Sequence, residues 1–157
     1  MKKTIQVLTI FLLLSLMVGC QTEKKTFEKN GVSITLTDRF IEKEVVQVGF
    51  YLESNDHIFM SNRESKESLS YIGVSSLSQY TTQVLASAGK TAEVHTSEDG
   101  YRYAYYESVV NDQSFGYMLL TFEGEDHFYT MNFGCLSKNL EKNKSLYFQW
   151  AKTIVIE

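Results

Sequence analysis

The sequence predicts an α+β domain, a largely antiparallel β-sheet with two main helices packed on it, behind an N-terminal export signal. Short runs of alternating apolar and polar residues recur between turn residues, and two segments place apolar residues at helical spacing. None of the 157 residues is proline. Tight turns between successive runs indicate antiparallel hairpins, and helices inserted among such strands favour the α+β class.

The first 20 residues have the order of charges and apolar residues of a bacterial export signal. Lys2 and Lys3 precede an almost wholly apolar run over 5–18, which is too short to span a membrane comfortably. The next segment, Leu16-Met17-Val18-Gly19-Cys20, resembles the lipobox of bacterial lipoproteins, although Met17 stands where leucine is commonest. An ordinary signal peptide or an anchor helix with an incidental Cys20 is the alternative.

The lipobox resemblance implies a lipid anchor at the cell membrane. In that family the cysteine thiol receives a diacylglyceryl group, with fatty chains such as palmitate, and the signal is cut between the residues that match Gly19 and Cys20. Two chains anchor a protein far more firmly than one. We therefore expect a signal peptide over 1–19, a lipidated flexible tether over 20–28, and a single domain over 29–157 on the extracytoplasmic face.

The charge of the mature chain limits its partners. Loss of Lys2 and Lys3 leaves 13 basic residues against 19 acidic ones, a net charge of −6. Such a chain lacks the positive surface that nucleic-acid phosphates or an anionic membrane would attract. We expect no nucleic-acid partner, and we expect attachment to the membrane to be covalent.

Three strands are expected in the first half of the domain, at 32–36, 44–53 and 57–60. Apolar residues alternate with polar ones in the first, and Val46, Val48, Phe50 and Leu52 share one face of the second. Asn55-Asp56 is typical of the turn into the third strand. Residues 61–76 are rich in Ser, Glu and Lys and predict a long loop.

A helix over 77–88 separates the two halves of the domain, with Ser76 and Gln79 as a capping box and Gly89 as its stop. Strands are expected at 91–96, 101–109, 114–122 and 127–135, divided by turn residues. The strand at 114–122 is apolar on both faces, which predicts a central position covered on both sides. Ser137 is expected to cap a second helix over 138–151, before a last strand at 153–156.

In this order of elements, residues 27–157 resemble the PsbP-like superfamily, which includes an extrinsic subunit of photosystem II and many small bacterial lipoproteins. The resemblance rests on the segments 31–40, 76–80, 133–137 and 148–154. Thr37 stands where members often carry a proline. Members are mostly docking or accessory proteins, so the resemblance implies a non-enzymatic role, and it transfers no binding residue.

Candidate chemistry is sparse. The spacings of His57, His95 and His127 fit no metal motif, and we expect solvated histidines at strand ends, of which His57 and His127 are candidates to meet. Cys135 falls on the apolar face of its strand and is expected to be a buried structural thiol. We therefore expect no catalytic residue, no metal, no cofactor and no enzymatic activity.

One strand carries a row of tyrosines, Tyr101, Tyr103 and Tyr105, with Tyr106 on its other face. An exposed row would be a binding platform, whereas a row beneath a helix is core, which is the interpretation we favour. We expect an anchored accessory or binding domain for an envelope protein. A carrier of a small or lipidic ligand would need a deep apolar pocket. An envelope hydrolase would need a histidine beside Cys135 or a carboxylate pair across a cleft.

Overall fold

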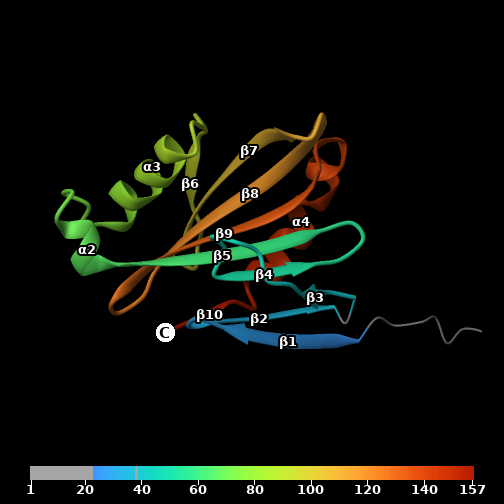
Figure 1. Cartoon of the computed structure of the whole chain (residues 1–157), viewed down its shortest axis with the longest axis horizontal. Coiled ribbons are helices and arrows are strands. Elements are labelled where there is room, and N and C mark those ends of the chain that lie inside the picture. Colours follow the sequence, from blue (N-terminus) through green and yellow to red (C-terminus); the bar gives the residue numbers. More distant parts are fainter. Residues whose placement is uncertain (1–22, 38) are drawn as a thin grey trace, which may run out of the picture.

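The computed structural model describes residues 23–37 and 39–157, so the expected signal over 1–19 and the lipidation site Cys20 lie outside the described residues. A seven-stranded sheet forms the centre of the domain, in the order β3-β4-β5-β9-β8-β7-β6, and a smaller sheet has the order β1-β2-β10. Every pairing between these strands is antiparallel, which confirms the α+β prediction (Figure 1). The strands are β1 (Lys24–Lys29), β2 (Val32–Thr37), β3 (Ile41–Glu42), β4 (Phe50–Glu53), β5 (Ile58–Ser65), β6 (Val94–Thr96), β7 (Arg102–Val110), β8 (Gln113–Glu123), β9 (His127–Leu136) and β10 (Val155–Ile156).

Four helical segments cover the large sheet. One face packs against α2 (Lys66–Ser70) and α3 (Leu77–Ser87), and the other against α4 (Leu140–Ala151), which follows a 3₁₀ turn at Ser137–Asn139, and against the small sheet. β8 lies between β9 and β7 with both faces covered, and its residues from Gly116 to Thr121 are buried, as predicted. None of the helices in the described residues is long and apolar enough to cross a membrane.

The main core lies between the large sheet, the small sheet and α4. Phe133 of β9 is fully buried, stacks on Tyr147 of α4 at a centroid distance of 5.2 Å, and lies 5.7 Å from the Trp150 ring. Phe40 meets Trp150 edge to face. Burial of each such ring contributes roughly 2–3 kcal/mol, so α4 and the strand-to-strand connection at Phe40 are held by aromatic packing.

The predicted capping box at the start of α3 is present, with one difference. The Ser76 hydroxyl oxygen accepts from the Gln79 backbone N–H at 3.3 Å, as expected. The Gln79 side chain reaches one residue further back, and its Oε1 accepts from the Ser75 N–H at 2.9 Å. Gly89 has a φ of +63°, so it ends the helix in the left-handed conformation that glycine adopts most easily.

The expected strand over 44–53 is wrong in its first half. Only Phe50–Glu53 form β4, while the preceding residues make a tight turn in which Val45 and Val48 bridge one another. Gln47 has a φ of +66°, and Val46 is 89% exposed. The turn is fixed by contacts from elsewhere, because the Gly49 carbonyl accepts from Asn30 and its N–H donates to Asn62.

Two polar segments expected to be irregular are in fact strands. The tether predicted over 20–28 becomes β1 from Lys24, since its backbone pairs along β2, and only Phe27 of that strand is buried. The loop predicted over 61–76 begins as strand, because β5 continues to Ser65 along β9 after its other neighbour, β4, has ended. A short helix, α2, then fills 66–70, with Ser65 as its cap.

The helix at the end of the chain begins differently from the prediction. The Ser137 hydroxyl donates to the Glu107 carboxylate rather than capping the helix, and Ser137–Asn139 form the 3₁₀ turn. Asn139 is the first flanking residue of α4 and makes no side-chain cap. The strands expected at 91–96 and 153–156 shorten to Val94–Thr96 and Val155–Ile156.

Candidate functional site

A groove of about 640 Å³ lies where α4 ends. Its floor contains Tyr101 and Phe122, whose ring centroids are 5.0 Å apart, and Ile154 and Ile156 lie on the side of the C-terminal segment. A second hollow of about 300 Å³ extends it past Tyr103. We call the two hollows together the α4 groove, and its lining residues come from the β6–β7 turn, the start of α3, the end of β8 and the segment after α4.

The tyrosine row predicted to be core packs beneath α4, as expected. Tyr101 is only 4% exposed, and Tyr103 meets Phe148 of α4 edge to face at 5.1 Å. The Lys144 ammonium lies 4.4 Å from the centre of the Tyr105 ring, which is half-buried. Burial raises the pKa of Tyr105 to about 12. Part of the row nevertheless borders open space, because Tyr101 and Tyr103 also line the α4 groove.

Tyr106, on the opposite face of β7, is held by three separate contacts. Its ring stacks on Tyr117 with 15° between the planes, and its hydroxyl donates to Asn132 Oδ1 at 2.9 Å. The Lys90 ammonium lies over the same ring. Burial raises the pKa of Tyr106 to about 12, so the phenol stays neutral and its role is to support the sheet.

Carboxylates dominate the rim of the α4 groove. Glu98 and Asp99 are exposed in the β6–β7 turn, and the Asp99 charge, after burial, is the second cause that raises the pKa of Tyr101. Glu123 is paired with Lys66 at 2.8 Å, and Lys152 lines both hollows together with Asp99. An aromatic floor with an acidic rim suits an apolar side chain that is followed by a cationic one.

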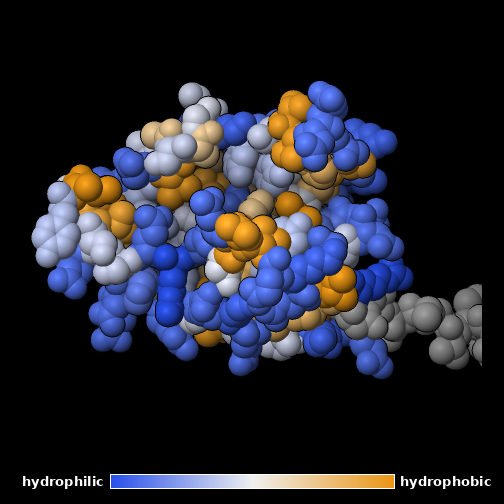
Figure 2. All heavy atoms as spheres, viewed as in Figure 1, coloured by the Kyte–Doolittle hydropathy of each residue, from blue (hydrophilic) through white to orange (hydrophobic). Residues whose placement is uncertain are grey.

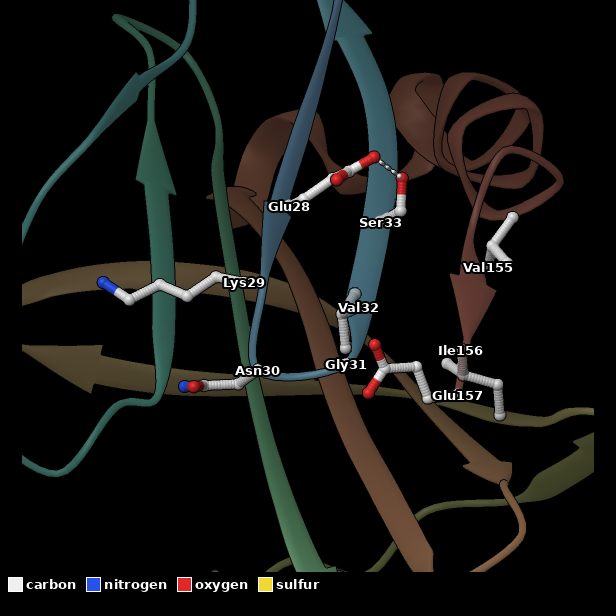
Figure 3. Close-up of a pocket in the computed structure, with 9 residues that line it drawn as sticks. All are labelled: Glu28, Lys29, Asn30, Gly31, Val32, Ser33, Val155, Ile156 and Glu157. Atoms are coloured by element: carbon white, nitrogen blue, oxygen red, sulfur yellow. Dashed lines mark hydrogen bonds between the residues drawn. The ribbon is translucent and has the colours of Figure 1, made fainter.

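A separate hollow of about 380 Å³, which we call the hairpin pocket, lies at the β1–β2 turn and shares Ile156 with the α4 groove. Figure 3 shows the Glu157 side chain directed at the turn residue Gly31. The Glu157 N–H donates to the Gly31 carbonyl at 3.1 Å, and the Tyr129 hydroxyl donates to the Glu157 carbonyl at 3.2 Å. These bonds fasten the β10 segment, which forms the wall between this pocket and the α4 groove.

Gly31 is required by the same arrangement. It has a φ of +74°, and a Cβ atom on it would lie 2.8 Å from the Tyr129 hydroxyl and 2.9 Å from the Arg63 guanidinium. Any other residue would be strained and would push these groups apart. Its neighbour Lys29 is engaged by Glu42 and Glu44, both at 2.7 Å, so the hairpin pocket offers no free ammonium to a ligand.

The chemistry that the hydrolase alternative required is only partly assembled. His57 lies in the β4–β5 turn with its Nδ1 atom 3.1 Å from the Tyr147 hydroxyl, and its ring meets Trp150 edge to face at 5.2 Å. Tyr147 also contacts Cys135, and burial followed by the Cys135 contact raises the pKa of the tyrosine. His57 and Cys135 also border one hollow of about 290 Å³ at this end of the sheet. The hydrogen-bonded link between them runs through Tyr147, a neutral phenol, which cannot accept the proton that a thiol nucleophile must lose.

His57 is not the solvated strand-end residue that the sequence predicted. It is half-buried between Tyr147 and Trp150, and this burial lowers its pKa, with a smaller lowering effect from Lys142 and an opposing one from Asp56. His57 and His127, which the sequence left as candidates to meet, lie far apart. The register pairs Ile58 with Gly134 and Ser65 with His127, which places the two histidines at opposite ends of the β5–β9 pair.

The remaining residues of interest are placed as follows. His95 packs on Tyr103 at 5.1 Å, and His127 lies 6.3 Å from the Tyr129 ring. Cys135 is 3% exposed within the main core, which confirms the buried thiol. Among residues 23–37 and 39–157, no group of three or more His, Cys, Asp or Glu side chains is close enough to hold a metal ion.

Sequence reasoning missed most of the α4 groove. The sequence indicates turn residues between the strands at 91–96 and 101–109, and it places the tyrosine row on one side of a strand. Nothing in the chain links either feature to Phe148 or Lys152. The groove and the hairpin pocket are both open to solvent. An enclosed apolar chamber of the kind that a lipid carrier needs is present in neither of them.

Comparisons with known proteins identify the fold. No family model and no curated protein matches the sequence. Solved structures do match it. The cyanobacterial PsbP protein (CyanoP) of Synechocystis sp. PCC 6803 aligns with a TM-score of 0.57 at 12% identity, over 90% of this chain and 96% of its own.

The Ran-binding protein Mog1p of Saccharomyces cerevisiae aligns equally well, with a TM-score of 0.57 at 11% identity, over 87% of this chain and 96% of its own. Identities this low carry information about the fold and not about the activity. Because both alignments extend over nearly the whole chain, the resemblance to PsbP-like proteins predicted from the sequence is confirmed at the level of the fold. The chain has the PsbP/Mog1 fold.

Proposed function

We propose that the protein is a lipid-anchored accessory domain, tethered through Cys20 on the extracytoplasmic face of the cell membrane, which binds an envelope protein in the α4 groove. The observation that carries the proposal is the groove itself, an open hollow of about 640 Å³ with an aromatic floor and an acidic rim. The lipobox residues 16–20 support the anchor. The comparison structures include a protein described as Ran-binding, which is compatible with a binding role for this fold.

The chemistry of the groove indicates the kind of partner. Phe122 and Tyr103, which are partly exposed above the buried Tyr101, are rigid apolar or amphipathic surfaces that bind side chains at a low cost in conformational entropy. Glu98 and Asp99 have no ion-pair partner among the described salt bridges. The groove is therefore suited to a peptide segment in which an apolar or aromatic residue is followed by Lys or Arg.

The absence of enzymatic activity is part of the proposal. Cys135 is buried, and its hydrogen-bonded link to His57 runs through the neutral phenol of Tyr147, an arrangement that does not activate a thiol nucleophile. The carboxylates at the groove rim are exposed to solvent and are not enclosed in a cleft. A binding role requires none of these features, and it uses the surface that the fold leaves open.

Crosslinking and affinity capture from intact cells test the binding role. The wild-type chain is compared with the double variant Glu98→Lys/Asp99→Lys, and with Asp56→Lys as a matched charge reversal in an exposed turn at the other end of the sheet. We expect one envelope protein to be recovered with the wild type and with Asp56→Lys, and its yield to fall at least tenfold with the double variant. Equal recovery with all three, or no protein above a soluble control, would contradict the proposal.

A further inference from the structure

Negative charge gathers at one end of the large sheet. Four segments meet there: the β8–β9 turn, the β6–β7 turn, the end of β5 and the C-terminal segment. The Lys66 N–H donates a hydrogen bond to the Asp126 carbonyl, and Glu157 packs against Gly124. Eight carboxylates face four cations at this acidic end, and both the α4 groove and the hairpin pocket open there. The carboxylates are Glu64, Glu67, Glu98, Asp99, Glu123, Glu125, Asp126 and Glu157, and the cations are Arg63, Lys66, Arg102 and Lys152.

The opposite end of the sheet, the tether end, has the reverse balance. β1 begins there, since Lys24 pairs with Thr37, and Thr37 borders one hollow with the β4–β5 turn. That turn borders another hollow with Gln113 and Asn139. Among the described residues six cations face four carboxylates here; these are Lys24, Lys25, Arg39, Lys90, Lys138 and Lys142, and Glu23, Asp56, Glu107 and Asp112. The count leaves out the ion pairs Lys43–Glu53 and Lys144–Glu141, and the cluster of Lys29 with Glu42 and Glu44, which adds one net negative charge.

The net charge of the mature chain conceals this asymmetry. A value of −6 predicts repulsion from an anionic membrane, but most of the excess negative charge belongs to the acidic end. Figure 1 shows the separation, with the start of β1, the β4–β5 turn and the start of α4 at one end and the β8–β9 turn with α2 at the other. Even if Asp38, which lies outside the described residues, is added to the tether end, cations there are not outnumbered.

The length of the connecting chain makes this asymmetry matter. Because β1 starts at Lys24, only residues 21–23 separate Cys20 from the folded domain. Three residues span about 10 Å when fully extended. That distance is close to the Debye length at physiological ionic strength, about 8 Å, so the tether end of a Cys20-anchored domain stays within the field of the membrane surface.

We propose that the tether end rests on the anionic bilayer surface, and that the acidic end, with the α4 groove, points away from the membrane. This inference rests on the proposed lipid anchor. A surface potential of about −30 mV changes the population of a state roughly threefold for each unit charge brought into it. Turning the domain over would replace a weakly positive end by a strongly negative one, so the field selects one orientation.

The tip of the β7–β8 hairpin fits this orientation. Val109 and Val110 are 69% and 47% exposed, and Val110 pairs with Gln113 at the tether end. Apolar groups gather over this corner of the molecule in Figure 2, beside hydrophilic ones. Exposed aliphatic side chains at an end of the sheet that also carries cations are suited to shallow contact with the headgroup region, where apolar burial and attraction to anionic lipid act together.

The test uses the lipidated full chain in vesicles that contain a headgroup-located quencher. A fluorophore is placed on a new cysteine, either Val110→Cys at the tether end or Glu125→Cys at the acidic end; Cys135 is buried and Cys20 is acylated. With phosphatidylglycerol in the vesicles, we expect quenching at position 110 to exceed that at position 125 at least threefold. In neutral phosphatidylcholine vesicles the ratio should fall, and the short tether should keep it above one.

Charge variants separate the inference from the proposed anchor. Arg39→Glu/Lys138→Glu/Lys142→Glu should lower the ratio on anionic vesicles at least twofold, while Arg63→Glu/Lys152→Glu, at the acidic end, should leave it unchanged or raise it. Flotation is measured on every sample. A chain that does not float with the vesicles contradicts the anchor, whereas a chain that floats but shows equal quenching at both positions contradicts the orientation alone.

Discussion

His57 and Tyr147 are joined by a hydrogen bond of 3.1 Å between Nδ1 and the phenol oxygen, which connects the β4–β5 turn to the middle of α4. The Trp150 ring, about one helical turn further along α4, packs edge to face against the same histidine. Burial at this point lowers the pKa of His57, so the neutral ring is the form that the fold binds best.

The protein should therefore lose stability as the solution becomes acidic. The pKa of His57 is lower in the folded than in the unfolded chain, so the unfolded chain takes up the proton first. Stability begins to fall as the pH drops through about 6.5, the ordinary pKa of histidine in an unfolded chain. It continues to fall until the pH has passed the pKa of His57 in the folded chain. Urea unfolding at pH 7.5 and pH 5.5 measures it, and His57→Gln should reduce the difference. His127→Gln is the control: it keeps the His57–Tyr147 pair, so the difference in stability between the two pH values should remain.

The close approach of β8 to α4 predicts that Gly116 cannot carry a side chain. A Cβ atom there would lie 2.8 Å from both Cβ and Cδ2 of Leu140, the first residue of α4. We expect Gly116→Ala to lower the free energy of unfolding by about 1–3 kcal/mol and Gly116→Val to lower it further. Ser114→Ala, exposed on the same strand, should change it by less than about 0.5 kcal/mol in chemical denaturation. A neutral Gly116→Val would mean that α4 sits further from the sheet.

The cap of α3 makes a separate prediction. Ser76→Ala removes the acceptor of the Gln79 N–H and should lower the free energy of unfolding by about 0.5–2 kcal/mol. Ser78→Ala, on an exposed position of the same first turn, is the matched control and should have little effect. If both variants behave alike in thermal unfolding, the capping role assigned to Ser76 is wrong.

Cys135 should behave as a core thiol. It is 3% exposed and packs in the main core, so a thiol-specific reagent must wait for the chain to open. In a Cys20→Ser chain we expect labelling to be orders of magnitude slower in buffer than in 8 M urea, with a rate that rises as denaturant is added. Rapid labelling of the native chain would instead support an accessible and reactive thiol, and with it the hydrolase alternative.

Elements whose own side chains show which positions are buried or capped were predicted well from the sequence. The alternation at Val32, Ile34 and Leu36 reports one buried face directly, and all three side chains are buried in the small sheet. The apolar run of β8 indicates that both faces of the strand are buried. Ser76 with Gln79 indicates the start of a helix, which depends on neighbouring residues alone. In each case the determining contacts are local, or they require only that the residue be buried.

Elements held by distant backbone or charge contacts were not predicted. The second half of β5 is polar because only β9 pairs with it there, so its composition resembles that of a loop. Val45 and Val46 favour a strand, but Asn30 and Asn62 hold the neighbouring Gly49 in a turn. Ser137 resembles a helix cap, yet Glu107, a residue of β7, accepts its hydrogen bond.

The candidate site depends on such distant contacts even more strongly. The α4 groove exists because Lys152 and Phe148 are brought beside the β6–β7 turn by the packing of α4 on the sheet. The asymmetry of charge between the two ends likewise appears only when turns far apart in the chain are placed together. Net charge, the quantity available from the sequence, averages the two ends and conceals their difference.

The central claim is that Cys20 is the lipid-bearing first residue of the mature protein. Intact-mass and N-terminal peptide mass spectrometry of the protein isolated from membranes tests this claim most directly. We predict an N-terminal peptide that begins at Cys20 and carries the mass of a diacylglyceryl group. We also predict that the Cys20→Ala protein is lost from the membrane fraction. A mature chain that begins at another residue, or an unmodified Cys20 in membrane-bound protein, would contradict the account.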